Sequence, residues 1–440
     1  MRTTSKSTRR LLAWLRQPIL LAVLLCLAVS AVPAHADTRI IVRVQGGQFA
    51  VQTICALLGC HVQYGLGDPL GQVFLVTSPN LLSIQLLLSI PGVLDAEIDQ
   101  TGRTLAATYP GAPPPALLDN TPVNYYGTTV RQGYVQQPAT QLINLAAAQS
   151  TYNVAGSGIV AVIDTGVDTT HPALQGVLLP GQDFTRNQSG ADEKGDVTQS
   201  TTAVVDQSTT AVVDQSTTAV IDQYTANILN QPQYAAFGHG TMVAGVVHLT
   251  APGAMILPLK SFRADGTGYN SDVIRAIYYA ARNNASVINM SFSFAFPSAE
   301  LNSAVKTANK NGIVCVAAAG NDGQQIQVYP AAYSTMVMGV ASTSNSDTLS
   351  GFSNYGAPTV WVGAPGEGVV TLYPYGTYAA TWGTSFSAPF VAGTAALLQS
   401  VSPANETQAS QSIAHAVYIN SALVNGRLDV YQAVQSWRSQ

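Results

Sequence analysis

Charged side chains are scarce in this chain of 440 residues, in which they make up 10% of the composition. Typical soluble domains have roughly 25%. Five of the 19 basic residues precede Asp37, the first acidic residue, so loss of residues 1–36 would leave 14 basic against 23 acidic side chains. Because such a chain offers little positive charge to a polyanion, we expect no nucleic-acid partner.

The apolar run near the N-terminus, Ile19–Val32, is shorter than the about 20 residues that a membrane-spanning helix needs, and Pro33 ends it. A basic segment precedes this run and Ala34-His35-Ala36 follows it, which is the three-part organisation of a signal peptide. The alternative is a retained membrane anchor. We predict a signal peptide over residues 1–36, an extracellular or periplasmic location, and no membrane attachment after its removal.

Cysteine is also rare, and only Cys55, Cys60 and Cys315 lie outside the predicted signal peptide. Cys55 and Cys60 are close enough in sequence to be bridged in an oxidising compartment. Cys315 lies in the apolar run Ile313–Ala317, which predicts a central strand. We therefore expect Cys315 to be a small buried hydrophobic residue and not a nucleophile.

Residues 37–105 alternate between strand-like and helix-like patterns. The pattern predicts strands at Ile40–Val44, Val73–Thr77 and Leu94–Ile98 and helices at Phe49–Leu58 and Leu81–Ile90, and it leaves room for one more strand near His61–Tyr64. This order is typical of a small α+β domain of the ferredoxin type. Residues 106–138 are rich in proline and lack periodicity, which predicts an exposed linker.

From residue 139 to Gln440 the pattern changes to apolar strands separated by helices. The predicted strands are Ile159–Ile163, Met255–Leu259, Val287–Met290 and Ile313–Ala317, and the predicted helices are Ser271–Arg282 and Glu300–Lys310. Continuous apolar strands indicate an α/β fold, a parallel sheet with helices on both faces. Functional residues of such sheets lie just past the carboxyl ends of strands, where Asp164 and Asn321 occur.

An insertion at residues 199–223 interrupts this domain. It holds three copies of an eight-residue unit, Gln-Ser-Thr-Thr-Ala-Val-Val-Asp, which begin at Gln199, Gln207 and Gln215, and the last copy has Ile221 in place of a valine. Three such short units cannot form a stable solenoid. Two interpretations stay open: an expanded surface loop, or a ribbon that binds a substrate or a partner.

Four residues with complementary chemistry occur in the order Asp164, His239, Asn321 and Ser385, each inside a short glycine-bearing block. A serine hydroxyl attacks a carbonyl only when a base takes its proton. His239 is the candidate base, and Asp164 would orient its ring. Pro389, tolerated in the first turn of a helix, predicts that Ser385 lies at a helix N-terminus, where its N–H can donate to an oxyanion. Asn321 would supply a second donor.

These blocks resemble those of the subtilisin-like serine peptidases, the subtilases. The matching blocks are Val162–Asp168, Gly238–Gly245, Ala318–Asn321 and Gly383–Pro389. The resemblance extends from about residue 139 to Gln440, where Gly426–Val430 is similar to the closing segment of the family. It implies a subtilisin-like fold and hydrolysis of peptide bonds.

By this resemblance Asp164, His239 and Ser385 form the catalytic triad and Asn321 is the oxyanion donor. A peptide substrate would lie as an added strand between two edges. The residues implied for these edges are Gly266, Thr267, Gly268, Ser291, Phe292 and Ser293. Residues 37–105 resemble the inhibitory propeptides of the family, so the chain is expected to be a proenzyme that processes itself, with its own propeptide as intramolecular inhibitor.

The chain departs from the family pattern at three places. Ser293 stands where glycine is common and narrows the expected pocket. Ala173 replaces an aspartate that binds calcium in many relatives, which argues against calcium at this site; no metal and no cofactor are expected in the chemistry. Asp164 and His239 are 75 residues apart, more than double the usual interval, because of the repeat insertion.

Two functions of other classes compete with a secreted serine endopeptidase that acts through an acyl-enzyme on Ser385. One is a degenerate pseudopeptidase that only binds peptides. The other is a cell-surface display protein that uses the repeats and cleaves only itself. A lipase or esterase of the α/β-hydrolase type is excluded, because it needs a Gly-x-Ser-x-Gly elbow and the order Ser, Asp, His.

Overall fold

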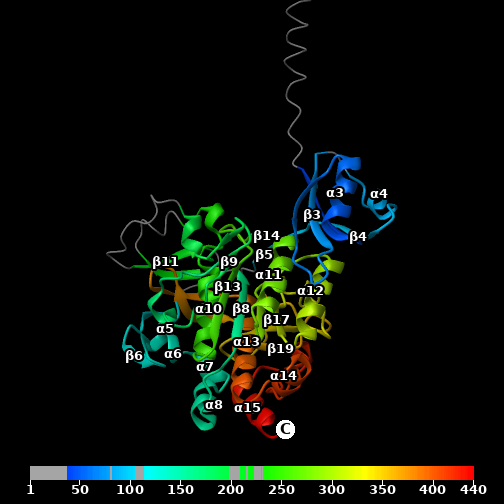
Figure 1. The fold of residues 1–440 in the computed structure, drawn as a ribbon. Helices are drawn as coiled ribbons and strands as arrows, with labels where there is room; N and C mark the ends of the chain where they lie inside the picture. The colour runs from blue at the N-terminus through cyan, green and yellow to red at the C-terminus, as the bar shows by residue number, and fades with distance from the viewer. Residues whose placement is uncertain are drawn as a thin grey trace, which may run out of the picture.

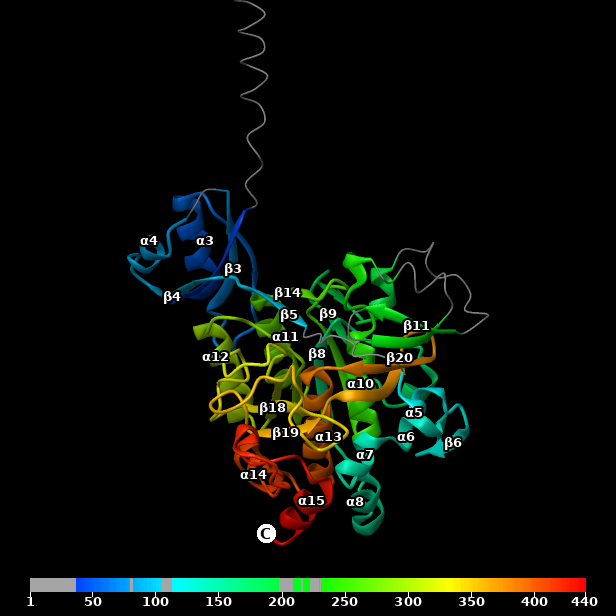
Figure 2. The ribbon, with the colours of Figure 1, turned by 180° about the vertical axis from the view of Figure 1, so that it is seen from behind.

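The computed structural model describes residues 37–79, 82–104, 113–197, 209–214, 217–221, 229 and 231–440 (Figure 1). The predicted signal peptide lies outside these residues. A large sheet with covering helices forms the main body, and a smaller sheet with its own helices lies beside helices α11 (Asn270–Arg282) and α12 (Ala299–Lys310) (Figures 1 and 2). Among the helices that the structure describes, none combines the length and hydropathy of a bilayer span.

The large sheet has eight strands, and every neighbouring pair is parallel except β10 and β9. All four strands that the sequence predicts for this domain are present, within one residue at each end. In spatial order the strands are β10 (Gln188–Ser189), β9 (Gln182–Asp183), β13 (Met255–Lys260), β8 (Ile159–Asp164), β15 (Val287–Met290), β17 (Val314–Ala318), β18 (Met338–Thr343) and β19 (Val362–Pro365).

Helices cover both faces of this sheet, which explains why its strands are apolar throughout. Val160 and Val162 of β8 lie in the core shared with α10 and α13, and Ala161 and Ile163 lie in the core shared with α11 and α12. Successive strand residues point to opposite faces, so both sets must be apolar. The α/β fold class is confirmed. The covering helices are α10 (His239–Thr250), α13 (Thr384–Val401), α11 (Asn270–Arg282) and α12 (Ala299–Lys310).

The smaller sheet is antiparallel, with strand order β2-β3-β1-β4. Its elements follow in the order β-α-β-β-α-β, which is the predicted order β-α-β-α-β completed by the strand for which the sequence leaves room, and this is the ferredoxin type. Its elements are β1 (Thr38–Val44), α3 (Gly47–Leu58), β2 (His61–Gly65), β3 (Val73–Ser78), α4 (Ile84–Leu88) and β4 (Val93–Ile98). A disulfide joins Cys55 of α3 to Cys60.

Residues 113–138 are not the exposed linker that their prolines suggest. Leu117, Val130 and Tyr134 are buried, and the hydroxyl of Tyr134 donates to the carbonyl of Gly245 in α10 at 2.6 Å. Single buried apolar side chains between the prolines hold this segment against the main body. Because these side chains are isolated in the sequence, they give no helical or strand periodicity. Its elements, with the helix that follows, are α5 (Pro115–Leu118), β6 (Pro122–Tyr125), β7 (Thr128–Arg131), α6 (Gln132–Val135), α7 (Pro138–Leu142) and α8 (Leu145–Tyr152).

The described part of the repeat insertion is a two-stranded ribbon. Its strands come from the second and third copies and pair antiparallel with each other, and the second of them pairs with β21. The first copy lies outside the described residues. The four strands of this sheet, in spatial order, are β11 (Thr209–Asp214), β12 (Thr217–Ile221), β21 (Thr377–Trp382) and β20 (Glu367–Tyr373).

Glu406 at the start of α14 (Glu406–Ile413) is buried and accepts a hydrogen bond from the backbone N–H of Cys315 at 2.6 Å. Burial raises the pKa of this carboxyl from 4.5 to about 8. The thiol of Cys315 is buried as well, and burial raises its pKa, as expected for a structural cysteine. The fold therefore favours the neutral form of Glu406.

Because the folded pKa of Glu406 lies above its ordinary value, the stabilising effect of the neutral carboxyl is complete below pH 4.5 and is lost as pH rises through about 8. Glu406→Gln keeps an acceptor oxygen and cannot ionise. We expect it to raise the melting temperature relative to wild type at about pH 9 and to change it little at about pH 5. Thermal unfolding of both chains measures this; an equal difference at the two pH values would contradict it.

Candidate active site

The four residues that the motifs single out lie at the carboxyl edge of the large sheet and at the starts of two helices. Asp164 is the last residue of β8, and Asn321 lies three residues beyond β17. His239 is the first residue of α10, and Ser385 is the second residue of α13. Parallel strands present their carboxyl ends at one edge of a sheet, so residues far apart in sequence meet there.

Asp164 and His239 form a buried pair. Oδ1 of Asp164 lies 2.7 Å from Nδ1 of His239 and accepts a second hydrogen bond from the backbone N–H of Thr165, also at 2.7 Å. Nε2 of His239 is buried and has no hydrogen-bond partner in the part of the chain that the structure describes. The His239 ring centroid is 5.3 Å from that of Phe386, the residue after Ser385. The imidazole thus lies at the start of α13 with one nitrogen available.

Ser385 is held by reciprocal hydrogen bonds with Ser291, which follows β15. Pro389 is the sixth residue of α13 and not in its first turn as predicted, so the helix continues through it. Since proline has no N–H, the carbonyl of Ser385 loses its partner within the helix. The hydroxyl of Ser291 donates to this carbonyl at 2.8 Å, and the hydroxyl of Ser385 donates to the carbonyl of Ser291 at 3.2 Å.

Asn321 is oriented by the residue before the serine. Its Oδ1 accepts hydrogen bonds from the backbone N–H and from the hydroxyl of Thr384, both at 2.9 Å. These hydrogen bonds fix the orientation of the side-chain amide, and its Nδ2 group takes no part in them. Nδ2 is buried and has no partner among the residues described. Asn321 therefore presents an unused N–H donor close to the N-terminus of α13.

Close backbone contact brings α10 against the loop that follows β8. A Cβ atom on Gly240 would lie 1.9 Å from the carbonyl oxygen of Gly166. Real Cβ atoms do not approach backbone oxygens so closely, so only glycine permits this packing. The glycine after His239 thus lets the imidazole reach Asp164.

Glu193 is a buried residue of this region that the sequence did not reveal. Its carboxyl accepts hydrogen bonds from the hydroxyl of Thr165 at 3.0 Å and from the backbone N–H of Gly238 at 2.9 Å and of Thr241 at 3.2 Å. Burial raises its pKa to about 8. Glu193 joins the loop after Asp164 to the start of α10, yet its sequence context, a charged turn before the repeats, carries no distinguishing signal.

The predicted substrate edges flank a strand from the chain's own N-terminal part. Strand β5 (Thr101–Thr104) pairs antiparallel with β14 (Thr267–Tyr269) on one side and with β16 (Phe292–Ser293) on the other. The N–H of Thr104 donates to the carbonyl of Gly266 at 2.9 Å. Ser291 is outside this pairing and contacts Ser385 instead. A cleft of about 630 Å³ follows β5 toward Asn321.

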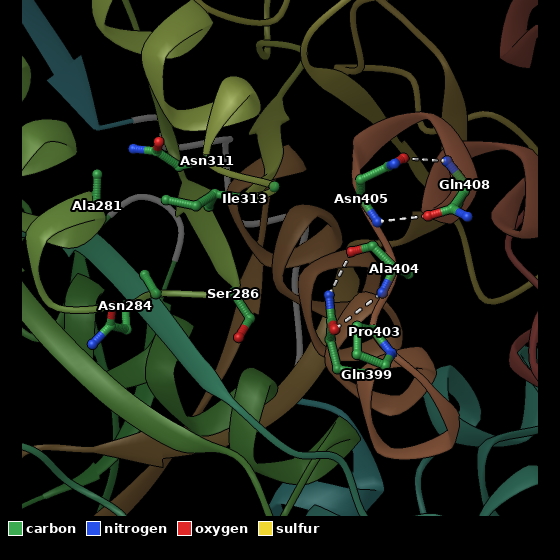
Figure 3. Close-up of a pocket in the computed structure, with 12 residues that line it drawn as sticks. Ala281, Asn284, Ser286, Asn311, Ile313, Gln399, Pro403, Ala404, Asn405 and Gln408 are labelled. Carbon is green, nitrogen blue, oxygen red and sulfur yellow. Dashed lines mark hydrogen bonds between the residues drawn. The ribbon is translucent and has the colours of Figure 1, made fainter.

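A second hollow, of about 750 Å³, lies at the amino ends of β15 and β17 (Figure 3). Three of its amide side chains are engaged with the backbone. Gln399 exchanges two hydrogen bonds with Ala404, and Asn405 exchanges two with Gln408 (Figure 3). No lining residue is ionisable, so we assign no chemistry to this hollow.

The described residues contain no cluster of metal ligands. No group of three or more His, Cys, Asp or Glu side chains is arranged there to hold a metal ion. In the segment where Ala173 departs from the family pattern, His171 accepts a hydrogen bond from the N–H of Ala173 at 3.2 Å, and its Nε2 lies 3.1 Å from the carbonyl oxygen of Thr377. The ring of His171 is thus engaged with the backbone on both sides.

Comparison with known proteins places the chain in a family. The model of the subtilase family, Peptidase_S8, matches residues 156–434. Thermitase of Thermoactinomyces vulgaris is 34% identical over 294 residues, which are 64% of this chain and 90% of that protein. The thermophilic serine proteinase of Bacillus sp. (strain AK1) is 36% identical over 243 residues, or 55% of this chain and 52% of that protein.

Among solved structures, the fold is similar to that of fervidolysin from Fervidobacterium pennivorans, described as a keratinolytic enzyme related to subtilisin. The TM-score is 0.67 at 23% sequence identity, and the match covers 91% of this chain and 61% of fervidolysin. At this identity the likeness concerns the fold alone.

Proposed function

The chain belongs to the subtilase family and is a serine-type endopeptidase, and on this premise we propose that Asp164, His239 and Ser385 are its catalytic triad. In this proposal Nε2 of His239 takes the hydroxyl proton of Ser385 as the oxygen attacks the peptide carbonyl. His239 then gives the proton to the leaving amine, and water releases the acyl group. The observation that carries the proposal is the 2.7 Å contact between Asp164 and His239, with Nε2 buried and unpartnered in the described residues.

We propose Nδ2 of Asn321 and the backbone N–H of Ser385 as the donors to the oxyanion. Both groups belong to elements fixed before the reaction, Asn321 through Thr384 and Ser385 through α13. Donors that need no reorganisation stabilise the charge that develops on the carbonyl oxygen.

Asn321→Ala is expected to lower kcat by about 10² to 10³ and to leave KM nearly unchanged, because the bond forms fully only in the transition state. Steady-state kinetics on a chromogenic peptide measure both constants. Asn311→Ala is the matched control and should keep wild-type kinetics, because Asn311 is exposed, precedes β17 and does not line the cleft. Wild-type kcat in a folded Asn321→Ala chain would remove Asn321 from the mechanism.

Residues 37–105 are proposed to be an inhibitory propeptide. In support, β5 lies between the two predicted substrate edges, and two carboxylates of this segment bind at helix N-termini of the main body. Asp99 accepts from the N–H of Ser271 at 2.8 Å in the first turn of α11, and Glu97 accepts from the N–H of Ala299 at 2.9 Å at the start of α12. Anions are favoured at such termini because the unpaired N–H groups carry partial positive charge.

The register of β5 suggests the bond that is cut. Thr104 pairs with Phe292, and the neighbour of Phe292 on that edge, Ser291, accepts the hydrogen bond of the Ser385 hydroxyl. The residue after Thr104 is the one that antiparallel pairing would set against Ser291. We therefore propose cleavage of the bond between Leu105 and Ala106, in a chain that is exported and then processes itself.

The test is to express residues 37–440 and to follow chain mass and casein hydrolysis over time. The expected result is a new N-terminus at Ala106, with casein hydrolysis rising as the full-length chain disappears. A folded chain that stays whole and inert would support the peptide-binding pseudopeptidase. Self-cleavage without casein hydrolysis would support the display protein.

A further inference from the structure

Gly102 in β5 has no room for a side chain. A Cβ atom built on it would lie 2.6 Å from Cε1 of Phe294 and 2.8 Å from both Cδ1 and Cζ of the same ring. Contacts below 3.0 Å do not occur for real Cβ atoms, so any other residue requires the ring to move. The ring of Phe294 thus takes the place where a side chain at position 102 would lie.

Phe294 is held on several sides. It is 2% exposed, its N–H donates to the carbonyl of Tyr329 at 2.8 Å, and its carbonyl accepts from the N–H of Tyr329 at 3.0 Å. Its ring packs edge-on against Phe292 at 5.9 Å between centroids, and Phe292 packs against Phe262 at 4.8 Å. A ring locked in a row of three aromatic side chains does not withdraw without disturbing its neighbours.

The other positions of β5 are less restricted. Thr101 and Arg103 are exposed and Thr104 is half-buried, whereas Gly102 is buried. Gly102 pairs with Gly268 of β14. Gly268 is similarly confined, because a Cβ atom on it would lie 2.7 Å from Cδ1 of Phe262. Steric restriction is therefore concentrated at one position of the bound strand.

We propose that the ring of Phe294 fills the subsite that would take a side chain at the position of Gly102. The enzyme then selects substrates with glycine three residues before the residue whose carbonyl is attacked. This inference rests on the proposed function, in which β5 lies where a substrate lies. The substrate class is then protein segments of the form Gly-x-x-Leu, the pattern that Gly102 begins in the chain itself. Phe294 is a specificity-determining residue, and the neighbouring exposed positions tolerate any side chain.

The test uses the processed wild-type enzyme and peptides that copy residues 101–108, Thr-Gly-Arg-Thr-Leu-Ala-Ala-Thr, with glycine, alanine or phenylalanine at the second position. We expect kcat/KM to fall about tenfold for alanine and about 100-fold for phenylalanine, with cleavage after leucine in each case. The matched control has phenylalanine at the first position, the position that corresponds to exposed Thr101. It should be cleaved as fast as the glycine peptide.

Phe294→Ala should accept the phenylalanine peptide at least as well as the glycine peptide. The wild-type peptide series decides the question even where this variant fails to fold. Equal rates for all three peptides with wild type would overturn the inference while leaving the proposed function intact, as would a folded Phe294→Ala chain with wild-type selectivity. No cleavage of any peptide by a folded, processed chain would overturn the proposed function and the inference with it.

Discussion

Ser385→Ala is expected to fold and to neither shorten itself nor hydrolyse casein, with kcat lowered about 10⁶-fold, the loss found in subtilisin when its nucleophile is removed. The variant loses the hydroxyl that attacks the carbonyl. It keeps the hydrogen bond from the hydroxyl of Ser291 to the backbone carbonyl of residue 385. The start of α13 should therefore stay in place, and thermal unfolding should change little.

Ser387→Ala is the matched control, because Ser387 is a second buried serine in the same helix and its hydroxyl has no partner among the described residues. We expect it to process itself and to turn over casein near the wild-type rate. Intact mass and casein hydrolysis are measured for all three chains in parallel. Substantial casein hydrolysis by Ser385→Ala would show that another residue is the nucleophile.

Asp164→Asn should lower kcat about 10⁴-fold, the second largest effect that the site predicts. Oδ1 of Asp164 serves both Nδ1 of His239 and the N–H of Thr165. An asparagine whose side-chain oxygen accepts from the N–H of Thr165 can donate its NH₂ group to Nδ1 of His239. Because Nδ1 is then the acceptor, the proton of the neutral ring lies on Nε2. His239 then has no lone pair on the nitrogen that must take the serine proton.

This loss should concern kcat far more than KM, because the hydrogen bonds of Asp164 orient His239, whereas the strand β5 pairs with β14 and β16. Asp168→Asn is the control: its carboxylate accepts from the N–H groups of Thr170 and Tyr375 and pairs with Lys194, whereas the ring of His239 is bonded to Asp164. We expect that variant to melt at a lower temperature and to keep kcat near the wild-type value. An Asp164→Asn chain with wild-type kcat would mean that His239 is oriented by another group.

The sequence predicts the positions of four strands of the central sheet to within one residue, because burial on both faces makes strands such as β8 continuously apolar. The predicted bounds of α11 and α12 differ from the observed bounds by one residue at most. The four motif residues were also singled out as candidates from sequence, since each lies in a glycine-bearing block, and the structure places them at the carboxyl edge of the sheet and at the starts of two helices. Gly240, which admits the carbonyl of Gly166, is one such case.

Other features depend on contacts between distant segments, and no local pattern reports them. Residues 113–138 attach through single buried side chains such as Tyr134, so their composition is that of a linker. In the sequence Glu193 is one residue of a charged turn, and only the folded chain brings its carboxyl into contact with Thr165 and Gly238. The proposed selection of glycine depends on the contact between Gly102 and Phe294, which are 192 residues apart in sequence. Neither residue alone indicates this specificity.

The central claim, that Ser385 is a nucleophile activated by His239, is tested most directly by covalent labelling with a fluorophosphonate. The processed enzyme is incubated with the reagent, and intact mass and peptide mapping locate the adduct. We expect one adduct per chain, on Ser385, with loss of casein hydrolysis in proportion to labelling and no adduct in His239→Ala. A folded, processed enzyme that stays unlabelled, or that is labelled at another residue as activity is lost, would contradict the account.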